Sequence, residues 1–235
     1  MTPTQASLFA SLVPTGVAVH EIFRPPDHPA ATLWWAALPE EERLQALQAV
    51  SARRADLAAG RRLAHAALAS FGADVPVIGR GIRGEPLWPA GTIGSITHCE
   101  GYAAAAAAAT TACCAIGIDV EPALSLPAGV LDAIASNSER GHIAALELHD
   151  AWTPWDRLLF CIKEACYKAW YPLERSWLDF PDATVHLDPS SETFAVEIGP
   201  HVQRSILPAR LDGRWAVRGG FIGTALTIDT TAGSC

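Results

Sequence analysis

The sequence predicts an α+β protein, because its clearest helical segments come early and midway and its strand candidates gather late. Residues 39–72 and 154–170 carry apolar residues at helical spacing. Residues 180–229 instead alternate short runs of branched and aromatic residues with turn residues. At 235 residues the chain is long enough to bury a substantial core.

The first helical segment starts at Pro39 and an acidic triplet, which suit a helix N-terminus. Phe71 and Gly72 suit its end. Its apolar stripe is broken, and Ser51 could cap a second segment that begins near Ala52. The segment is therefore predicted as one helix or as two consecutive ones.

The middle of the chain is predicted to contain strands at residues 92–97 and 115–120. Between them lie seven consecutive alanines, residues 103–109, whose propensity favours a helix. The Thr-Thr-Ala-Cys-Cys that follows and the lack of a cap argue against a helix, so the residues alone leave this run undecided. Residues 76–91 are rich in glycine and proline and predict a loop with one short strand.

The clearest helix is predicted over residues 154–170, with Pro154 in its first turn and Pro172 as its stop. Glu164 and Lys168 lie on its polar side at a spacing that favours an ion pair worth about 0.3–0.5 kcal/mol. A solvated pair is one interpretation. Aromatic residues interleave this side, however, which a merely solvated face seldom needs.

Composition excludes several classes of protein. Half of the residues are apolar and 18% are charged, so a disordered chain is not expected. The net charge of −8 argues against a nucleic-acid-binding protein with a broad basic face. The uncharged stretch of residues 101–118 contains threonines and glycines and is flanked by Glu100 and Asp119, so we expect it to be buried and not membrane-spanning.

The cysteines and the N-terminus indicate the compartment. The first 23 residues lack a basic region and are interrupted by Pro14 and Gly16, so no signal peptide is expected. The six cysteines show no zinc-type spacing. A cytoplasmic protein with reduced thiols is therefore predicted.

Two acids at the end of the predicted strand 115–120 are candidates for metal binding. Asp119 and Glu121 are two residues apart, so in a strand both carboxylates leave the same face. They repel one another unless a cation lies between them, and Mg²⁺ prefers such oxygen ligands. A strand end with solvated acids is the alternative. His98 and the arginines of residues 53–62 likewise have structural alternatives when taken singly.

The motifs taken together are more specific than any one of them. In order, the chain contains ARRADLAAGRR, GEPLWP, SITHCEGY, GIDVEP and WDRLLFCIKEACYKAWYPL. Over roughly residues 50–180 this set resembles the 4′-phosphopantetheinyl transferases, in particular the larger Sfp-like class and its enterobactin-type branch. The resemblance implies a fold of two similar α+β halves related by a pseudo-twofold axis, with the active site between them. It also implies that residues 102–110 form a strand.

The stretch from Pro122 to Pro127 is the predicted boundary between the two halves, which are residues 1–122 and 123–235. The resemblance implies transfer of the 4′-phosphopantetheine arm of coenzyme A to a serine of an apo acyl or peptidyl carrier protein. Adenosine 3′,5′-bisphosphate would be released, and Mg²⁺ would be required. A monomer is expected, because both halves lie in one chain.

The resemblance also implies roles for individual residues. Asp119, Glu121 and Glu164 would hold Mg²⁺, with Glu164 also the candidate general base, directly or through water. Lys168 would stabilise charge on the leaving group. The residues expected at the 3′-phosphate of coenzyme A are Arg53, Arg61, Arg80 and His98, and Thr97 would donate a hydroxyl to the same phosphate or to the pyrophosphate. Gly84, Glu85 and Pro86, together with Arg80, would lie beside the adenine.

Two rival functions use the same residues. A Mg²⁺-dependent hydrolase of nucleotide pyrophosphates would employ the carboxylates with water in place of serine. A coenzyme A-binding regulatory protein would keep the pocket without turnover, although it has less use for a base. Because carrier proteins are usually acidic, we expect a local apolar or basic patch beside the cleft to recognise them, and not long-range steering.

Overall fold

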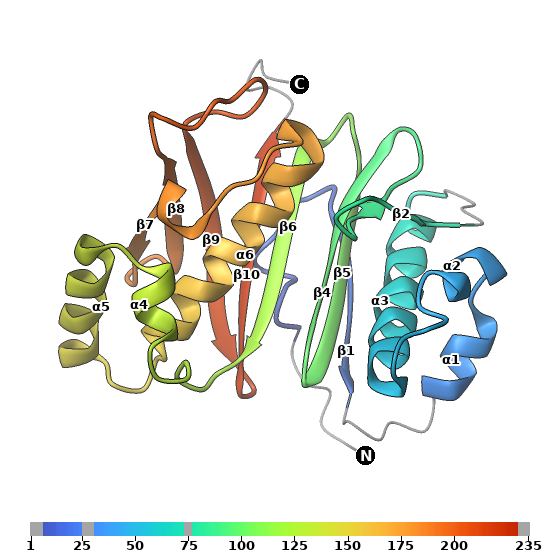
Figure 1. The fold of residues 1–235 in the computed structure, drawn as a ribbon, viewed down its shortest axis with the longest axis horizontal. Coiled ribbons are helices and arrows are strands. Elements are labelled where there is room, and N and C mark those ends of the chain that lie inside the picture. The colour runs from blue at the N-terminus through green and yellow to red at the C-terminus, as the bar shows by residue number, and fades with distance from the viewer. Residues whose placement is uncertain (1–6, 25–30, 73–76, 230–235) are drawn as a thin grey trace.

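The computed structural model describes residues 7–24, 31–72 and 77–229. The first six residues of the N-terminal segment, Pro76 of the predicted loop and the sixth cysteine, Cys235, lie outside the described residues. Two antiparallel sheets lie next to one another, and each is covered by helices (Figure 1). The predicted α+β class is confirmed.

The first sheet has the order β1-β5-β4 and is built around the alanine run. Its strands are β1 (Ala18–Arg24), β5 (Gly101–Ala109) and β4 (Thr92–Cys99). The strand expected over residues 102–110 is thus confirmed. Residues 103, 105 and 107 pack into one core cluster and residues 104, 106 and 108 into another. Small side chains let both layers approach β5 closely, and this tertiary packing overrides helix propensity.

Three helices accompany the first sheet: α1 (Ala31–Ala37), α2 (Glu40–Leu44) and α3 (Ser51–Ala69). The predicted segment 39–72 is therefore two helices, with Pro39 as the N-cap of α2. Ser51 is the first residue of α3, whose N-cap is Val50. The buried face of α3 packs on the alanine strand, as its glycine and alanine content favours.

The second sheet has the order β6-β10-β9-β8-β7 and contains the predicted late strands. Its members are β6 (Cys113–Pro122), β10 (Phe221–Asp229), β9 (Arg210–Arg218), β8 (Thr193–Ile198) and β7 (Ala183–Asp188). Through its pairing with β10, β6 belongs to the sheet of late strands. The division of the chain at residue 122 and the pseudo-twofold relation stay predictions.

The helices on the second sheet are α4 (Val130–Ile134), α5 (Asn137–His149) and α6 (Trp155–Glu174), followed by the 3₁₀ helix η1 (Phe180–Asp182). The expectation that Pro172 stops α6 is wrong, because the helix runs on to Glu174 and ends at Arg175 with φ 53°. A proline in the last turn removes only one intrahelical hydrogen bond, so the final residues can stay helical.

Polar side chains join the two sheets where β4 and β6 lie side by side (Figure 1). The hydroxyl of Ser95 accepts a hydrogen bond from the amide of Ile118 at 3.1 Å. The hydroxyl of Thr97 accepts one from the amide of Val120 at 3.1 Å. These bonds satisfy buried backbone donors of β6 and fix the register of β6 relative to β4.

Strand β6 and helix α6 approach one another closely at Gly117. A Cβ added there would lie 1.9 Å from the carbonyl oxygen of Ala165. We expect Gly117→Ala to lower the free energy of unfolding by about 1–3 kcal/mol, because α6 would be pushed off the sheet. Gly141→Ala in α5 is the matched control, since a Cβ at that position meets nothing within 4 Å. It should stabilise the chain slightly in the same urea titration, and equal effects of the two changes would contradict this packing.

The thiol prediction holds for four cysteines and is wrong for one. Cys99, Cys113, Cys161 and Cys166 are free, whereas Cys114 is disulfide-bonded. Within the described residues, no helix is both long and apolar enough to cross a bilayer.

Candidate active site

Asp119 lies at the centre of the site, near the end of β6. Its Oδ1 accepts hydrogen bonds from Lys168 Nζ at 2.6 Å and from Thr97 Oγ1 at 2.9 Å. Its Oδ2 is buried and finds no partner among the described residues. One oxygen is thus held by two donors, while the other is buried without a hydrogen-bond donor from the described residues.

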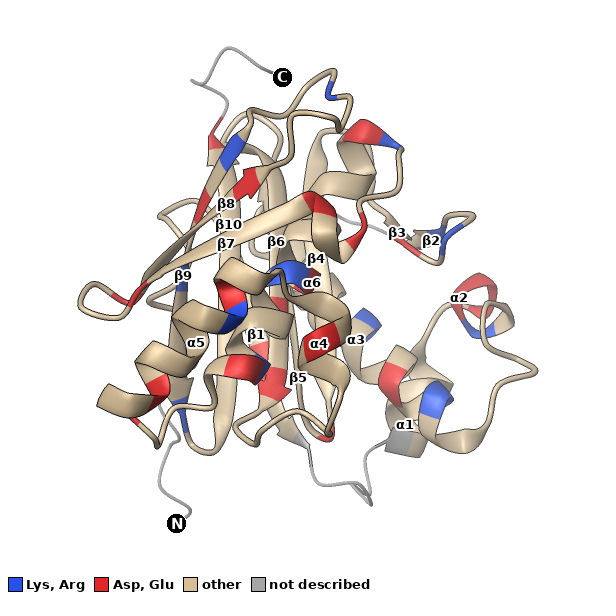
Figure 2. Ribbon diagram, turned by 60° about the vertical axis from the view of Figure 1, so that its left-hand side comes forward, with Lys and Arg blue, Asp and Glu red and all other residues tan. Residues whose placement is uncertain are grey.

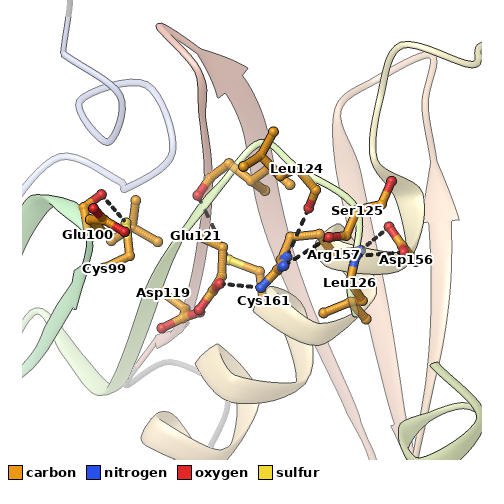
Figure 3. Close-up of polar contacts among 12 residues, drawn as sticks. Cys99, Glu100, Asp119, Glu121, Leu124, Ser125, Leu126, Asp156, Arg157 and Cys161 are labelled. Carbon is orange, nitrogen blue, oxygen red and sulfur yellow. Dashed lines mark hydrogen bonds and ion pairs between the residues drawn. The ribbon is translucent and has the colours of Figure 1, made fainter. Parts of the chain in front are cut away.

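Glu121 lies two residues further along β6, as the alternation of a strand requires. Its Oε2 accepts a hydrogen bond from Arg157 Nη1 at 3.0 Å (Figure 3). Burial and the charge of Asp119 raise the pKa of Glu121, and Arg157 opposes this shift. The two predicted carboxylates therefore lie close enough to repel one another.

Glu164 and Lys168 come from successive turns of α6. Burial and the charge of Asp119 raise the pKa of Glu164, while Lys168 lowers it. Lys168 Nζ pairs with Asp119 and also donates to the carbonyl oxygen of Ile118 at 3.2 Å. The lysine therefore connects α6 to β6, which the interpretation as a solvated pair within one helix does not describe.

Asp119, Glu121 and Glu164 offer the carboxylate oxygens that divalent cations such as Mg²⁺ prefer as ligands. The structure, over its described ranges, contains no ready-made group of three metal-ligating side chains. However, Asp119 keeps a buried oxygen unpaired, and its charge raises the pKa of both Glu121 and Glu164. A cation among three oxygen donors would relieve this repulsion, and an all-oxygen set is what Mg²⁺ prefers.

The line along which β4 and β6 lie side by side is called the seam between the sheets. Two of the predicted phosphate-binding residues lie together on its first-sheet side. Arg53 of α3 donates from Nη1 to Nε2 of His98 on β4 at 3.1 Å. Because a guanidinium group only donates, Nε2 of a neutral His98 accepts and the proton lies on Nδ1. Nδ1 lies 3.9 Å from a carboxylate oxygen of Asp56. The structure thus places a cation and an imidazole side by side on the first sheet and its helix.

Arg61 is deeply buried, with 3% of its surface exposed. Its Nη2 donates to Gln45 Oε1 at 3.0 Å and to the carbonyl oxygen of Gly79 at 2.9 Å. No described residue accepts a hydrogen bond from its Nε or Nη1. Burial lowers the pKa of Arg61, and the charge of Glu42 opposes this. Direct contact with a phosphate stays a prediction that uses these two free donors.

Arg80 lies on a small hairpin of β2 (Gly79–Arg80) and β3 (Pro86–Leu87), where one short strand was expected. Its Nη1 donates to the backbone oxygen of Gln45 at 3.0 Å. At the hairpin turn, Gly84 has φ 89°, a region that favours glycine. A Cβ at this glycine would lie 3.2 Å from the Arg80 guanidinium, so the turn and the arginine pack directly together.

The hairpin is tied to the end of α6 by two contacts. Glu85 pairs with Arg175 at 3.0 Å. The guanidinium of Arg83 lies 5.5 Å from the ring centroid of Trp177. The Glu85 side chain is therefore engaged in holding the two parts of the molecule together, and its expected place near the adenine stays a prediction.

A cavity of about 180 Å³ opens beside Glu164, and the sequence interpretation missed it. Its walls are mainly apolar and include Tyr167, Trp177 and Phe180. The hydroxyl of Tyr167 is buried without a partner among the described side chains. The aromatics interleaved with the polar side of the helix were the signal for this cavity.

The sequence interpretation also missed Arg157. It lies seven residues before Glu164, which is two helical turns, so its place on the same side of α6 could have been inferred from spacing.

Comparisons with known proteins agree with this arrangement. Residues 40–108 match the family model of the 4′-phosphopantetheinyl transferase N-terminal domain, and residues 115–217 match that of the 4′-phosphopantetheinyl transferase superfamily. The chain is 38% identical to the 4′-phosphopantetheinyl transferase Npt of Nocardia iowensis over 93% of its own length and 99% of that protein. It is also 38% identical to the 4′-phosphopantetheinyl transferase PptT of Mycobacterium tuberculosis, over 96% of its own length and 100% of that protein.

The fold and the paired acids thus belong to a transferase, and the chain is a member of the 4′-phosphopantetheinyl transferase superfamily. The enterobactin-type branch has weaker support. Enterobactin synthase component D of Salmonella austin is 34% identical, but over only 60% of this chain and 56% of that protein.

Proposed function

We propose that this enzyme transfers the 4′-phosphopantetheine arm of coenzyme A to a serine of an apo acyl or peptidyl carrier protein, releasing adenosine 3′,5′-bisphosphate with Mg²⁺ bound. The observation that supports this most is Asp119, which is held by Lys168 and Thr97 and keeps one buried oxygen free. Both sheets contribute residues, so a monomer can form the complete site.

In the proposed reaction the serine oxygen forms a bond to the phosphorus that carries pantetheine. The pyrophosphate P–O bond breaks, and the leaving group departs as adenosine 3′,5′-bisphosphate. Glu164 would accept the serine proton, since a carboxylate with a raised pKa is a better base at neutral pH. Lys168 would donate to the leaving phosphate. Bound Mg²⁺ supplies charge neutralisation for the pyrophosphate.

Coenzyme A would lie across the seam between the sheets. We place its 3′-phosphate at Arg53 and His98, which lie 3.1 Å apart, because the remaining guanidinium donors of Arg53 suit an anion. Arg61 and Arg80 would contribute further positive charge. The narrow cavity beside Glu164 would hold part of the pantetheine arm, because its aromatic walls suit an uncharged chain.

The carrier protein would dock on the rim of this cavity. Ile82 and Leu87 of the hairpin and Trp177 are exposed, and Arg83 and Arg175 lie among them. Elsewhere, basic and acidic residues are interspersed along the ribbon (Figure 2). An apolar patch with two arginines suits an acidic partner at short range without long-range steering.

Ile82→Asp tests this surface, because Ile82 is 95% exposed and is not among the residues that line the cavity beside Glu164. We expect about a tenfold increase in KM for the carrier, corresponding to a loss of about 1.4 kcal/mol. The affinity of this variant for coenzyme A, measured by calorimetry, should equal that of the unaltered enzyme. Leu148→Asp on α5, where Leu148 is 88% exposed, is the matched control. Similar KM values for the two variants would place the docking surface elsewhere.

The function itself is tested by the intact mass of several apo carrier proteins incubated with enzyme, coenzyme A and Mg²⁺. A gain of one phosphopantetheine unit, matched by adenosine bisphosphate and lost with a chelator, is expected. Adenosine bisphosphate released without a carrier would indicate the hydrolase. Binding of coenzyme A with no mass gain on any carrier would favour the regulatory protein.

A further inference from the structure

Arg157 uses all three nitrogens of its guanidinium group next to the acidic centre (Figure 3). Nε donates to the carbonyl oxygen of Leu124 at 3.0 Å, and Nη2 donates to that of Ser125 at 3.0 Å. Nη1 donates to Glu121 Oε2 at 3.0 Å. The arginine therefore connects the first turn of α6 to the segment that follows β6.

A neighbouring residue strengthens this connection. Asp156 accepts a hydrogen bond from the amide of Leu126 at 2.8 Å. The first turn of α6 thus contacts three consecutive residues after β6 through side chains, and only Arg157 also reaches Glu121.

The geometry fixes one oxygen of Glu121 and leaves the other free. Because a guanidinium group is planar, the two bonds to backbone carbonyls determine the direction in which Nη1 points. The side chains of Arg157 and Glu121 are only 17% and 18% exposed, so water competes weakly for the pair. Within the part of the chain that the structure describes, Oε1 of Glu121 has no hydrogen-bond donor.

We propose that Arg157 is a positioning residue that orients Glu121 to bind the divalent cation. This rests on the proposed function, which assigns Glu121 to the metal. Carboxylate ligands are commonly oriented by a hydrogen-bond partner, and loss of that partner typically weakens metal affinity by about 10–100-fold.

A cation beside a metal ligand also repels the metal, and the charges of the site decide which effect dominates. Asp119, Glu121 and Glu164 contribute three negative charges when ionised, against two positive charges from Lys168 and Arg157. The five groups together are negative before Mg²⁺ binds. Loss of Arg157 would therefore remove its repulsion of the metal together with its orientation of Glu121, and we expect the loss of orientation to dominate.

The test measures binding of Mn²⁺, in place of Mg²⁺, from the electron paramagnetic resonance signal of the free ion, with coenzyme A present. Arg157→Gln should weaken Mn²⁺ binding by about 10–100-fold. Arg157→Lys keeps the charge but replaces the planar set of three nitrogens with a single one, so it cannot fix the direction of the bond to Glu121 and should weaken binding as well. Asp156→Ala removes the neighbouring tether without touching Glu121 and should change Mn²⁺ affinity least.

Each outcome decides between interpretations. Unchanged or tighter Mn²⁺ binding in both Arg157 variants would overturn the positioning role. If Asp156→Ala weakens binding as much as Arg157→Gln, the effect comes from the backbone segment and not from orientation of Glu121. Glu121→Gln tests the assignment of Glu121 to the metal separately from the role of Arg157. If this variant binds Mn²⁺ as the unaltered chain does, the assignment of Glu121 to the metal fails.

Discussion

Replacing Asp119 with alanine is expected to reduce phosphopantetheine transfer by about 10³-fold or more, with little loss of folding stability. Metal-ion stabilisation of phosphoryl charge is worth several kcal/mol, and about 1.4 kcal/mol corresponds to tenfold in rate. The variant loses the buried free oxygen and the partner of Lys168. The substitution also removes the charge that raises the pKa of Glu121 and Glu164. Relief of this repulsion offsets part of the folding stability lost with the hydrogen bonds of Asp119.

The measurement is the initial rate of holo-carrier formation by mass spectrometry. Asp212→Ala, which removes an exposed carboxylate on β9, is the matched control and should retain full activity. Urea titrations of both variants show whether a loss of rate reflects unfolding. A well-folded Asp119→Ala that keeps more than a tenth of the activity would remove Asp119 from the centre of the site.

The largest effect on stability is expected at Lys163, which lies on α6 one residue before Glu164. It is buried and pairs with Glu139 of α5 at 3.0 Å. Its Nζ also donates to the carbonyl oxygens of Ile134 at 2.8 Å and Phe180 at 2.9 Å. Burial lowers the pKa of Lys163, and Glu139 opposes this. One ammonium group thus connects the ends of α4 and α5 to η1.

Glu139 is equally committed. It accepts hydrogen bonds from the amides of Ser136 and Val185, each at 2.8 Å, and the first of these completes the capping box of α5. When the lysine is lost, Glu139 keeps these backbone donors but loses its buried counter-ion.

Lys163→Met should therefore lower the free energy of unfolding by about 3–5 kcal/mol, because it leaves an uncompensated buried charge. Glu147→Gln on the exposed side of α5 is the control and should change stability by less than about 0.5 kcal/mol. The double variant Lys163→Met with Glu139→Gln should lose clearly less than the sum of the single changes, which a double-mutant cycle measures. Additive losses would mean that the two groups do not interact.

Local patterns predicted much of this fold. The late strands, the two helical segments and the strand of β6 follow from periodicity and turn residues. The alanine strand could not be predicted from its residues, since only packing on both faces overrides the helix propensity of alanine. Helix α5 was missed although Ser136 and Glu139 form a readable capping box.

The site was predictable in its residues but not in its contacts. The motifs identified Asp119, Glu121, Glu164 and Lys168, and the structure brings the first and last together at 2.6 Å. That contact depends on β6 lying against α6, which no local pattern specifies. The burial of Arg61 was equally hidden, because helical spacing shows which residues share a face but not what covers that face.

In the proposed function, the end of β6 and the middle of α6 form one metal-dependent transfer site. The most direct test is a crystal structure with coenzyme A and Mn²⁺, using anomalous scattering at the manganese edge. We expect one strong anomalous peak in contact with Asp119, Glu121 and Glu164. We also expect the 3′-phosphate of the coenzyme at Arg53 and His98. A peak away from these carboxylates, or a coenzyme bound outside the seam between the sheets, would contradict this proposal.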